Sequence, residues 1–179
     1  MCNFALQCVI LNMFKRLKYL QLTVLILFLT GCAHEYNQVY KSSDYNYRYE
    51  FAKECFANGK YSFAVPLLQD LVTIKKGTAD AQECLYMLAM AEYGMKDYEA
   101  AAETFKKYYQ SYPRGYYAEM ASFYVGQSLY MSTPEPRLDQ SQTVAAIAAF
   151  QEYRDLFPDG KLKGTAEERH MELPDKLVT

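Results

Sequence analysis

Cys32 is the residue whose surroundings most clearly prescribe a chemistry, because it follows a short apolar run with a basic flank. The run Leu20–Leu29 is preceded by three basic residues within positions 15–18 and followed by Thr30 and Gly31. A basic flank, a short apolar stretch and small residues before a cleavage point are typical of a secretory signal peptide. About ten apolar residues are too few to span a bilayer, which needs roughly 20. We therefore predict a signal peptide that ends just before the cysteine.

The ending Leu29-Thr30-Gly31-Cys32 resembles the lipobox of bacterial lipoproteins. The resemblance implies that residues 1–31 are removed and that Cys32 is acylated, palmitate included, as the new first residue. The alternative is that this stretch ends an ordinary buried helix, but the basic flank and the absence of acids before Glu35 favour the signal. Met13 is a candidate for the true start, because it opens a signal of normal shape.

The composition of the remaining chain, residues 32–179, argues against nucleic-acid binding. Its 148 residues are enough for one modest domain. Residues 1–31 contain three of the 19 Lys and Arg and none of the 21 Asp and Glu. The rest therefore carries 16 basic and 21 acidic residues, a net charge of −5, which gives no support for a polyanionic partner.

Of the five cysteines, only Cys55 and Cys84 follow the lipobox. They could pair in an oxidising compartment, but two buried thiols on helices are the favoured interpretation. There is no CxxC motif and no spacing typical of metal ligands, and the only histidines are His34 and His170. We expect no metal and no cofactor apart from the covalent lipid on Cys32.

No residue pattern predicts catalysis. Nothing resembles a Ser-His-acid set, a phosphate-binding glycine loop or a metal cluster. Glu92, Glu99 and Glu103 are interpreted as helix-surface acids without an evident partner. We expect a protein that is not an enzyme.

The elements that position these residues are helices. Residues Ala33–Asp44 are polar and are interpreted, together with Cys32, as a tether (32–44) that leads into one domain over residues 45–179. From Tyr45 on, apolar residues recur at helical spacing, and no segment alternates as a strand would. Helices of about 14 to 17 residues are predicted between the breaks. These breaks are Asn58-Gly59, Gly77, Gly94, Pro113-Arg114-Gly115, Ser132–Pro136 and Pro158-Asp159-Gly160.

The helices repeat, with equivalent residues 37 positions apart in the first two units. The third unit matches once eight extra residues are allowed between its helices, in the stretch Ser132–Gln142. The columns of the repeat are Ala52, Ala89 and Gly126; Ala64, Ala101 and Ala146; Leu68, Phe105 and Phe150; Tyr108 and Tyr153; Pro113 and Pro158.

This pattern resembles the tetratricopeptide repeat, whose unit is a pair of antiparallel helices. The small residues would let paired helices approach closely, the larger apolar column would fill the space between units, and the prolines would end the second helix. The predicted fold is all-α: a tetratricopeptide-type α-solenoid of about three repeats plus one further helix, Thr165–Lys176, interrupted by Pro174.

Longer stretches resemble the BamD (YfiO) family, the lipoprotein subunits of the outer-membrane β-barrel assembly machine. They are Tyr98-Glu-Ala-Ala-Ala-Glu-Thr-Phe-Lys-Lys-Tyr-Tyr-Gln-Ser-Tyr-Pro113, Tyr117-Ala118-Glu119, Gly126-Gln-Ser-Leu-Tyr130 and Pro134-Glu-Pro-Arg-Leu-Asp139-Gln140 followed by Thr143. The resemblance runs from Cys32 to about Leu173. It implies a scaffold lipid-anchored to the periplasmic face of the outer membrane. Such a scaffold would bind unfolded β-barrel proteins and partner subunits of the machine, and would assist membrane insertion.

The family usually carries about five repeats, and its carboxy-terminal ones, which dock on the barrel subunit, are not evident here. Two alternatives to an assembly factor therefore stay open. One is a lipid-anchored tetratricopeptide adaptor that recruits cell-wall enzymes, and the other is a non-functional fragment.

Two candidate binding sites follow from the repeat. Positions seven residues apart on the first helix of each pair share a face, and all six such positions are aromatic: Tyr49, Phe56, Tyr86, Tyr93, Phe123 and Tyr130. They are predicted to line a groove for a peptide with aromatic side chains, although aromatics at repeat junctions are often core. The second candidate is a partner-binding loop at Asp139 and Gln140, where the simpler interpretation is a surface loop with Asp139 as a helix cap.

Overall fold

The computed structural model describes residues 16, 18–19, 21, 35–135 and 137–178. It divides into two compact units, Met1–Asp44 and Tyr45–Thr179, and each is taken by itself. In the first unit, residues 35–40 are helical, and the rings of Tyr36 and Tyr40 stack at 5.7 Å, an i, i+4 contact. Cys32 and the apolar run before it lie outside the described residues, apart from position 21.

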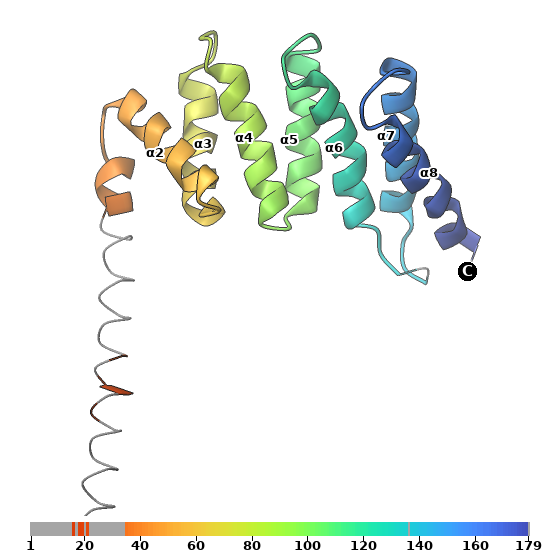
Figure 1. Cartoon of the computed structure of the whole chain (residues 1–179), viewed down its shortest axis with the longest axis horizontal. Helices are drawn as coiled ribbons and strands as arrows, with labels where there is room; N and C mark the ends of the chain where they lie inside the picture. Colours follow the sequence, from red (N-terminus) through yellow and green to blue (C-terminus); the bar gives the residue numbers. More distant parts are fainter. Residues whose placement is uncertain (1–15, 17, 20, 22–34, 136, 179) are drawn as a thin grey trace, which may run out of the picture. The chain divides into compact units, whose positions relative to one another are not determined.

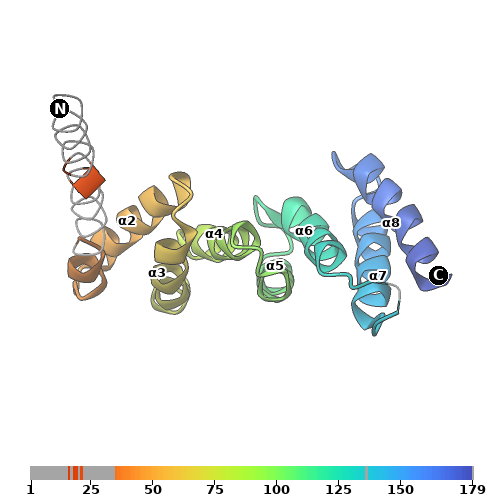
Figure 2. The same ribbon diagram turned by 90° about the horizontal axis from the view of Figure 1, so that it is seen from below.

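The second unit is built from helices, and no strand occurs among its described residues. In chain order the helices are α2 (Tyr45–Ala57), α3 (Tyr61–Ile74), α4 (Ala81–Gly94), α5 (Tyr98–Ser111), α6 (Ala118–Met131), α7 (Ser141–Leu156) and α8 (Lys163–Val178). Each packs on the next along the chain (Figure 1). Figure 2 shows α2, α4, α6 and α8 in one layer and α3, α5 and α7 in the other. We call these the A layer and the B layer, and they confirm the predicted solenoid of helix pairs.

The small residues of the repeat lie where paired helices approach each other. Ala52, Ala89, Ala64, Ala101 and Ala146 are all fully buried. At Gly126 of α6, an added Cβ would lie 2.8 Å from the ring of Phe150 on α7, so only glycine allows this approach. The larger column residues Leu68, Phe105 and Phe150 are also fully buried. The predicted columns are therefore the core of the solenoid.

A buried tyrosine near the end of α5, and another near the end of α7, forms hydrogen bonds that connect its helix to neighbouring A helices. The Tyr108 hydroxyl accepts a hydrogen bond from the Tyr117 backbone N–H at 3.2 Å and donates to Gln82 Oε1 at 3.3 Å. The Tyr153 hydroxyl accepts from the Leu162 N–H at 3.2 Å and donates to Glu119 Oε1 at 3.2 Å. Each hydroxyl thus joins three helices, because its acceptor belongs to the preceding A helix. These hydrogen bonds therefore connect successive repeats.

The last helix differs from the expectation. We predicted a helix over Thr165–Lys176 interrupted by Pro174, but α8 runs without a break over Lys163–Val178. Proline in a helix removes one backbone hydrogen bond and strains the preceding turn. Leu173, directly before it, is fully buried in the cluster that contains Phe123 and Phe150. We infer that this packing keeps the last turns helical.

Candidate functional site

All six aromatic residues of the predicted groove lie on A-layer helices, but they differ in exposure. Tyr49 and Phe56 belong to α2, Tyr86 and Tyr93 to α4, and Phe123 and Tyr130 to α6. Tyr49 and Phe123 are buried, each with 5% of its surface exposed, and the other four are half-buried. Two of the six are therefore core residues in this conformation. The surface available to a ligand comes from Phe56, Tyr86, Tyr93 and Tyr130.

Tyr86 and Tyr93 belong to a continuous set of packed rings between α4 and α6. The ring of Tyr86 stacks on Tyr117 with centroids 4.1 Å apart and planes within 5° of each other. Tyr93 meets Tyr124 edge to face at 5.3 Å. Burial raises the pKa of Tyr86 to about 12, so its hydroxyl stays protonated at neutral pH. Around Tyr86, this surface can offer flat apolar contact and a hydroxyl donor.

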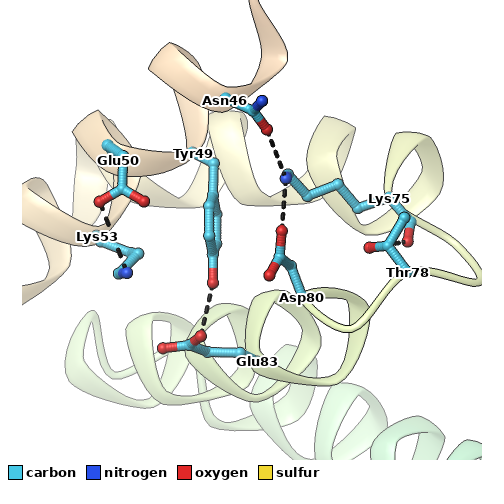
Figure 3. A network of polar contacts seen from close by, with 8 residues as sticks. All are labelled: Asn46, Tyr49, Glu50, Lys53, Lys75, Thr78, Asp80 and Glu83. Atoms are coloured by element: carbon cyan, nitrogen blue, oxygen red, sulfur yellow. Dashed lines mark hydrogen bonds and ion pairs between the residues drawn. The ribbon is translucent and has the colours of Figure 1, made fainter.

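Tyr49 lies at the centre of a charged network between the first two repeats (Figure 3). Its hydroxyl donates to Glu83 Oε2 at 2.6 Å. The amino group of Lys75 lies 4.6 Å from the ring centroid and that of Lys53 lies 5.0 Å from it, and Figure 3 shows them on either side of the ring. Burial, followed by the hydrogen bond to Glu83, raises the pKa of Tyr49. The arrangement locks the side chain in place as a neutral donor.

Lys75 is the most unusual member of this network, because it is a buried lysine with 7% of its surface exposed. Its amino group contacts Asp80 Oδ2 at 2.7 Å and Asn46 Oδ1 at 3.1 Å. These two contacts, together with the Tyr49 ring, offset the free-energy cost of burying the positive charge of Lys75. The network is consistent with a structural joint between α2 and α4.

Tyr130 makes a comparable joint at the other end of the A layer. Its hydroxyl donates to Glu172 Oε2 at 2.6 Å, and the Arg169 guanidinium lies 4.9 Å from its ring centroid. Arg169 also pairs with Glu172 at 3.1 Å. The hydrogen bond to Glu172 is the main cause that raises the pKa of Tyr130. In both joints a tyrosine donates to a glutamate of the next A helix while a cation covers its ring.

The loop between α6 and α7 is organised by the two residues predicted as a partner site. Gln140 donates from Nε2 to the carbonyls of Glu135 and Leu138 at 2.8 and 3.0 Å, and accepts from the Thr143 hydroxyl at 2.7 Å. Asp139 is exposed and accepts from the Ser141 N–H at 3.1 Å, beside the first turn of α7. These bonds shape the loop. Its role in partner binding stays a prediction.

The structure corrects the interpretation of one acidic residue. Glu92, interpreted as a surface acid, is buried with 7% exposed, and burial is the main cause that raises its pKa. Cys55 and Cys84 are buried cysteines outside any disulfide, and burial raises the pKa of Cys84 to about 11, so its thiol is not activated. No group of metal-binding side chains occurs among the described residues.

The partners of Tyr49 and Tyr130 were missed by the sequence analysis. Glu83 lies 34 residues after Tyr49 and Glu172 lies 42 residues after Tyr130. Because these spacings differ, the repeat does not predict them. The three-residue spacing of Arg169 and Glu172 predicts an ion pair on the surface of one helix. It does not predict that both residues contact Tyr130.

None of the helices in the described part of the chain combines the length and apolar character needed to cross a bilayer. A sequence model of the YfiO family, described as outer membrane lipoprotein, matches residues 41–179. A search of curated proteins gave no match.

Proposed function

Because the chain belongs to the YfiO family of outer membrane lipoproteins, we propose that it is an assembly factor for outer-membrane β-barrel proteins. In this proposal, lipid on Cys32 holds the chain at the periplasmic face of the outer membrane. The helical domain binds unfolded barrel proteins and partner subunits of the assembly machine. Family membership supports the association with the outer membrane, and the A-layer aromatics support the binding role.

The observation that carries the binding role is the half-buried aromatic surface of the A layer. Phe56, Tyr86, Tyr93 and Tyr130 keep part of their surface exposed while their rings are held by neighbours. Such rings lose little conformational entropy when a ligand binds, because packing already fixes them. Outer-membrane proteins end in segments rich in aromatic residues, which suit a surface of this kind.

The chemistry of the described residues also favours binding over catalysis. The perturbed tyrosines are protonated donors in structural joints, and the two described cysteines are buried thiols. No described residue combines an exposed nucleophile with a base, as acyl or phosphoryl transfer would require.

A peptide titration tests the proposal. The full-length Tyr86→Ala, Tyr93→Ala variant is expected to bind the carboxy-terminal peptide of an outer-membrane barrel protein about tenfold or more weakly than wild type, since each ring is an aromatic anchor. Tyr116→Ala is the matched control, because that tyrosine is 88% exposed and lies in the loop before α6. If the double variant does not fold, Phe56→Ser replaces it in the titration. That substitution removes one ring contact, the one between Phe56 and Tyr61.

Unchanged affinity in folded A-layer variants would refute the groove. Co-purification of the lipidated chain from membranes tests the partners. Recovery of the barrel-forming subunit supports the assembly role, whereas recovery of peptidoglycan enzymes without it favours the cell-wall adaptor.

A further inference from the structure

A cleft opens on the B layer, away from the A-layer aromatics. It lies between α5 and α7 and has a volume of about 520 Å³. Its floor is formed by Ser122, Val125 and Leu129 of α6, the A helix that packs against both walls. Figure 2 shows α5 and α7 on the same side of α6.

Two contacts join the opposite walls of the cleft. At the start of the helices, Gln142 Nε2 donates to Glu99 Oε1 at 3.4 Å. Toward their ends, the rings of Tyr109 and Phe157 meet edge to face at 6.3 Å. The wall residues on α7 run from Gln142 to Glu152, which at 1.5 Å per residue makes the cleft about 15 Å long, or roughly three helical turns.

Small apolar residues form part of both walls: Ala102 on α5, and Ala145, Ala148 and Ala149 on α7. All four lie inside regular helices, where backbone groups already bond within the helix. An extended peptide in the cleft would find few partners for its own N–H and C=O groups, whereas a helix satisfies them internally. The walls therefore favour a helical ligand with large apolar side chains.

The polar groups of the cleft indicate what the ligand must carry. Glu103 of α5 and Glu152 of α7 are exposed on opposite walls, and neither forms an ion pair with another described residue. Lys106 is the only cation of the lining. On the floor, Ser122 is buried, with 7% of its surface exposed. Two exposed acids on opposite walls of the cleft complement a ligand with basic flanks.

We propose that this cleft docks an amphipathic helix of a partner protein. Three or four apolar residues of the helix enter between α5 and α7, and flanking Lys or Arg residues pair with Glu103 and Glu152. The site is independent of the client-binding groove proposed for the A layer. One chain could thus hold an unfolded client on one face and a folded partner on the other.

Site-specific photo-crosslinking in the native membrane tests the proposal with the full-length lipidated protein. A photo-reactive amino acid replaces Ala148, an exposed wall residue, and in the control it replaces Val144, an exposed residue of α7 outside the cleft. We expect a crosslinked partner at position 148 that is absent at 144, with the crosslink mapped to an amphipathic segment that has basic flanks. A synthetic copy of that segment should compete in isolated membranes, and a copy with a central proline should not.

The charge requirement has a separate readout. Glu103→Lys combined with Glu152→Lys should lower the yield at position 148 by roughly fivefold, as expected from two exposed ion pairs. Both residues are exposed, so these changes leave the fold intact. The proposal is overturned if no product is specific to position 148, if the product is a second copy of this chain, or if the proline-containing copy competes equally well. It is also overturned if the double Lys variant crosslinks as well as wild type.

Discussion

Removing the hydroxyl of Tyr153 should loosen the joint between the last B helix and α8. The phenol is fully buried, accepts from the Leu162 N–H and donates to the Glu119 carboxylate. A neutral hydrogen bond contributes about 1 kcal/mol and one to a charged group about 1.5 kcal/mol or more. Glu119 keeps its 2.7 Å bond from the Lys161 N–H, which offsets part of the loss. Tyr153→Phe should therefore lower the free energy of unfolding by about 2 kcal/mol, or about 7 °C in Tm for a domain of this size.

Urea unfolding followed by circular dichroism measures the total loss, and hydrogen exchange locates it. Because repeats interact mainly with their neighbours, faster exchange should be confined to α7 and α8. Tyr109→Phe is the control, since Tyr109 packs its ring on Phe157 and its hydroxyl makes no hydrogen bond among the described residues. If both variants unfold at the same urea concentration, the hydroxyl of Tyr153 does not stabilise the joint and our reasoning fails.

Two further predictions concern the core. Gly126→Ala should destabilise the domain by about 1–2 kcal/mol. The new Cβ would clash with the buried Phe150 ring, and the cost of this clash exceeds the gain in helix propensity. Gly164→Ala in α8, where no other atom lies within 4 Å of the added Cβ, should instead stabilise the domain by about 0.5 kcal/mol. If both variants shift the Tm of thermal unfolding in the same direction, the packing argument is contradicted. Burial raises the pKa of Glu92 in the folded state above its unfolded-state value of about 4.5. A buried carboxyl of this kind makes the folded domain less stable as the pH rises above the unfolded-state pKa. Glu92→Gln should therefore stabilise the domain at pH 8. The advantage should shrink as the pH falls toward that value, and urea midpoints that differ equally at pH 8, 6 and 4.5 would exclude this explanation.

The spacing of small and apolar residues was enough to predict the solenoid. A helix pair needs close approach at one position, and Ala52, Ala89 and Gly126 occupy that position in three successive units. The helix breaks predicted at Gly59 and Gly77 also occur in the structure. Both residues have positive φ, a conformation that glycine adopts readily. The predicted interruption at Pro174 was wrong, since a local propensity was overridden by the burial of Leu173.

The sequence by itself determined the helices, their pairing, the family and the face on which six aromatic residues lie. Only the tertiary structure decided which of them are core, because burial depends on how far the next repeat covers each ring. Tyr49 is enclosed by Glu83 of α4 and by Lys75, the residue directly after α3, while Tyr86 is only half-buried. The cleft between α5 and α7 likewise has walls from two repeats and a floor from a third helix. Such a surface has no signature along the chain, since it exists only where separate helices are brought side by side.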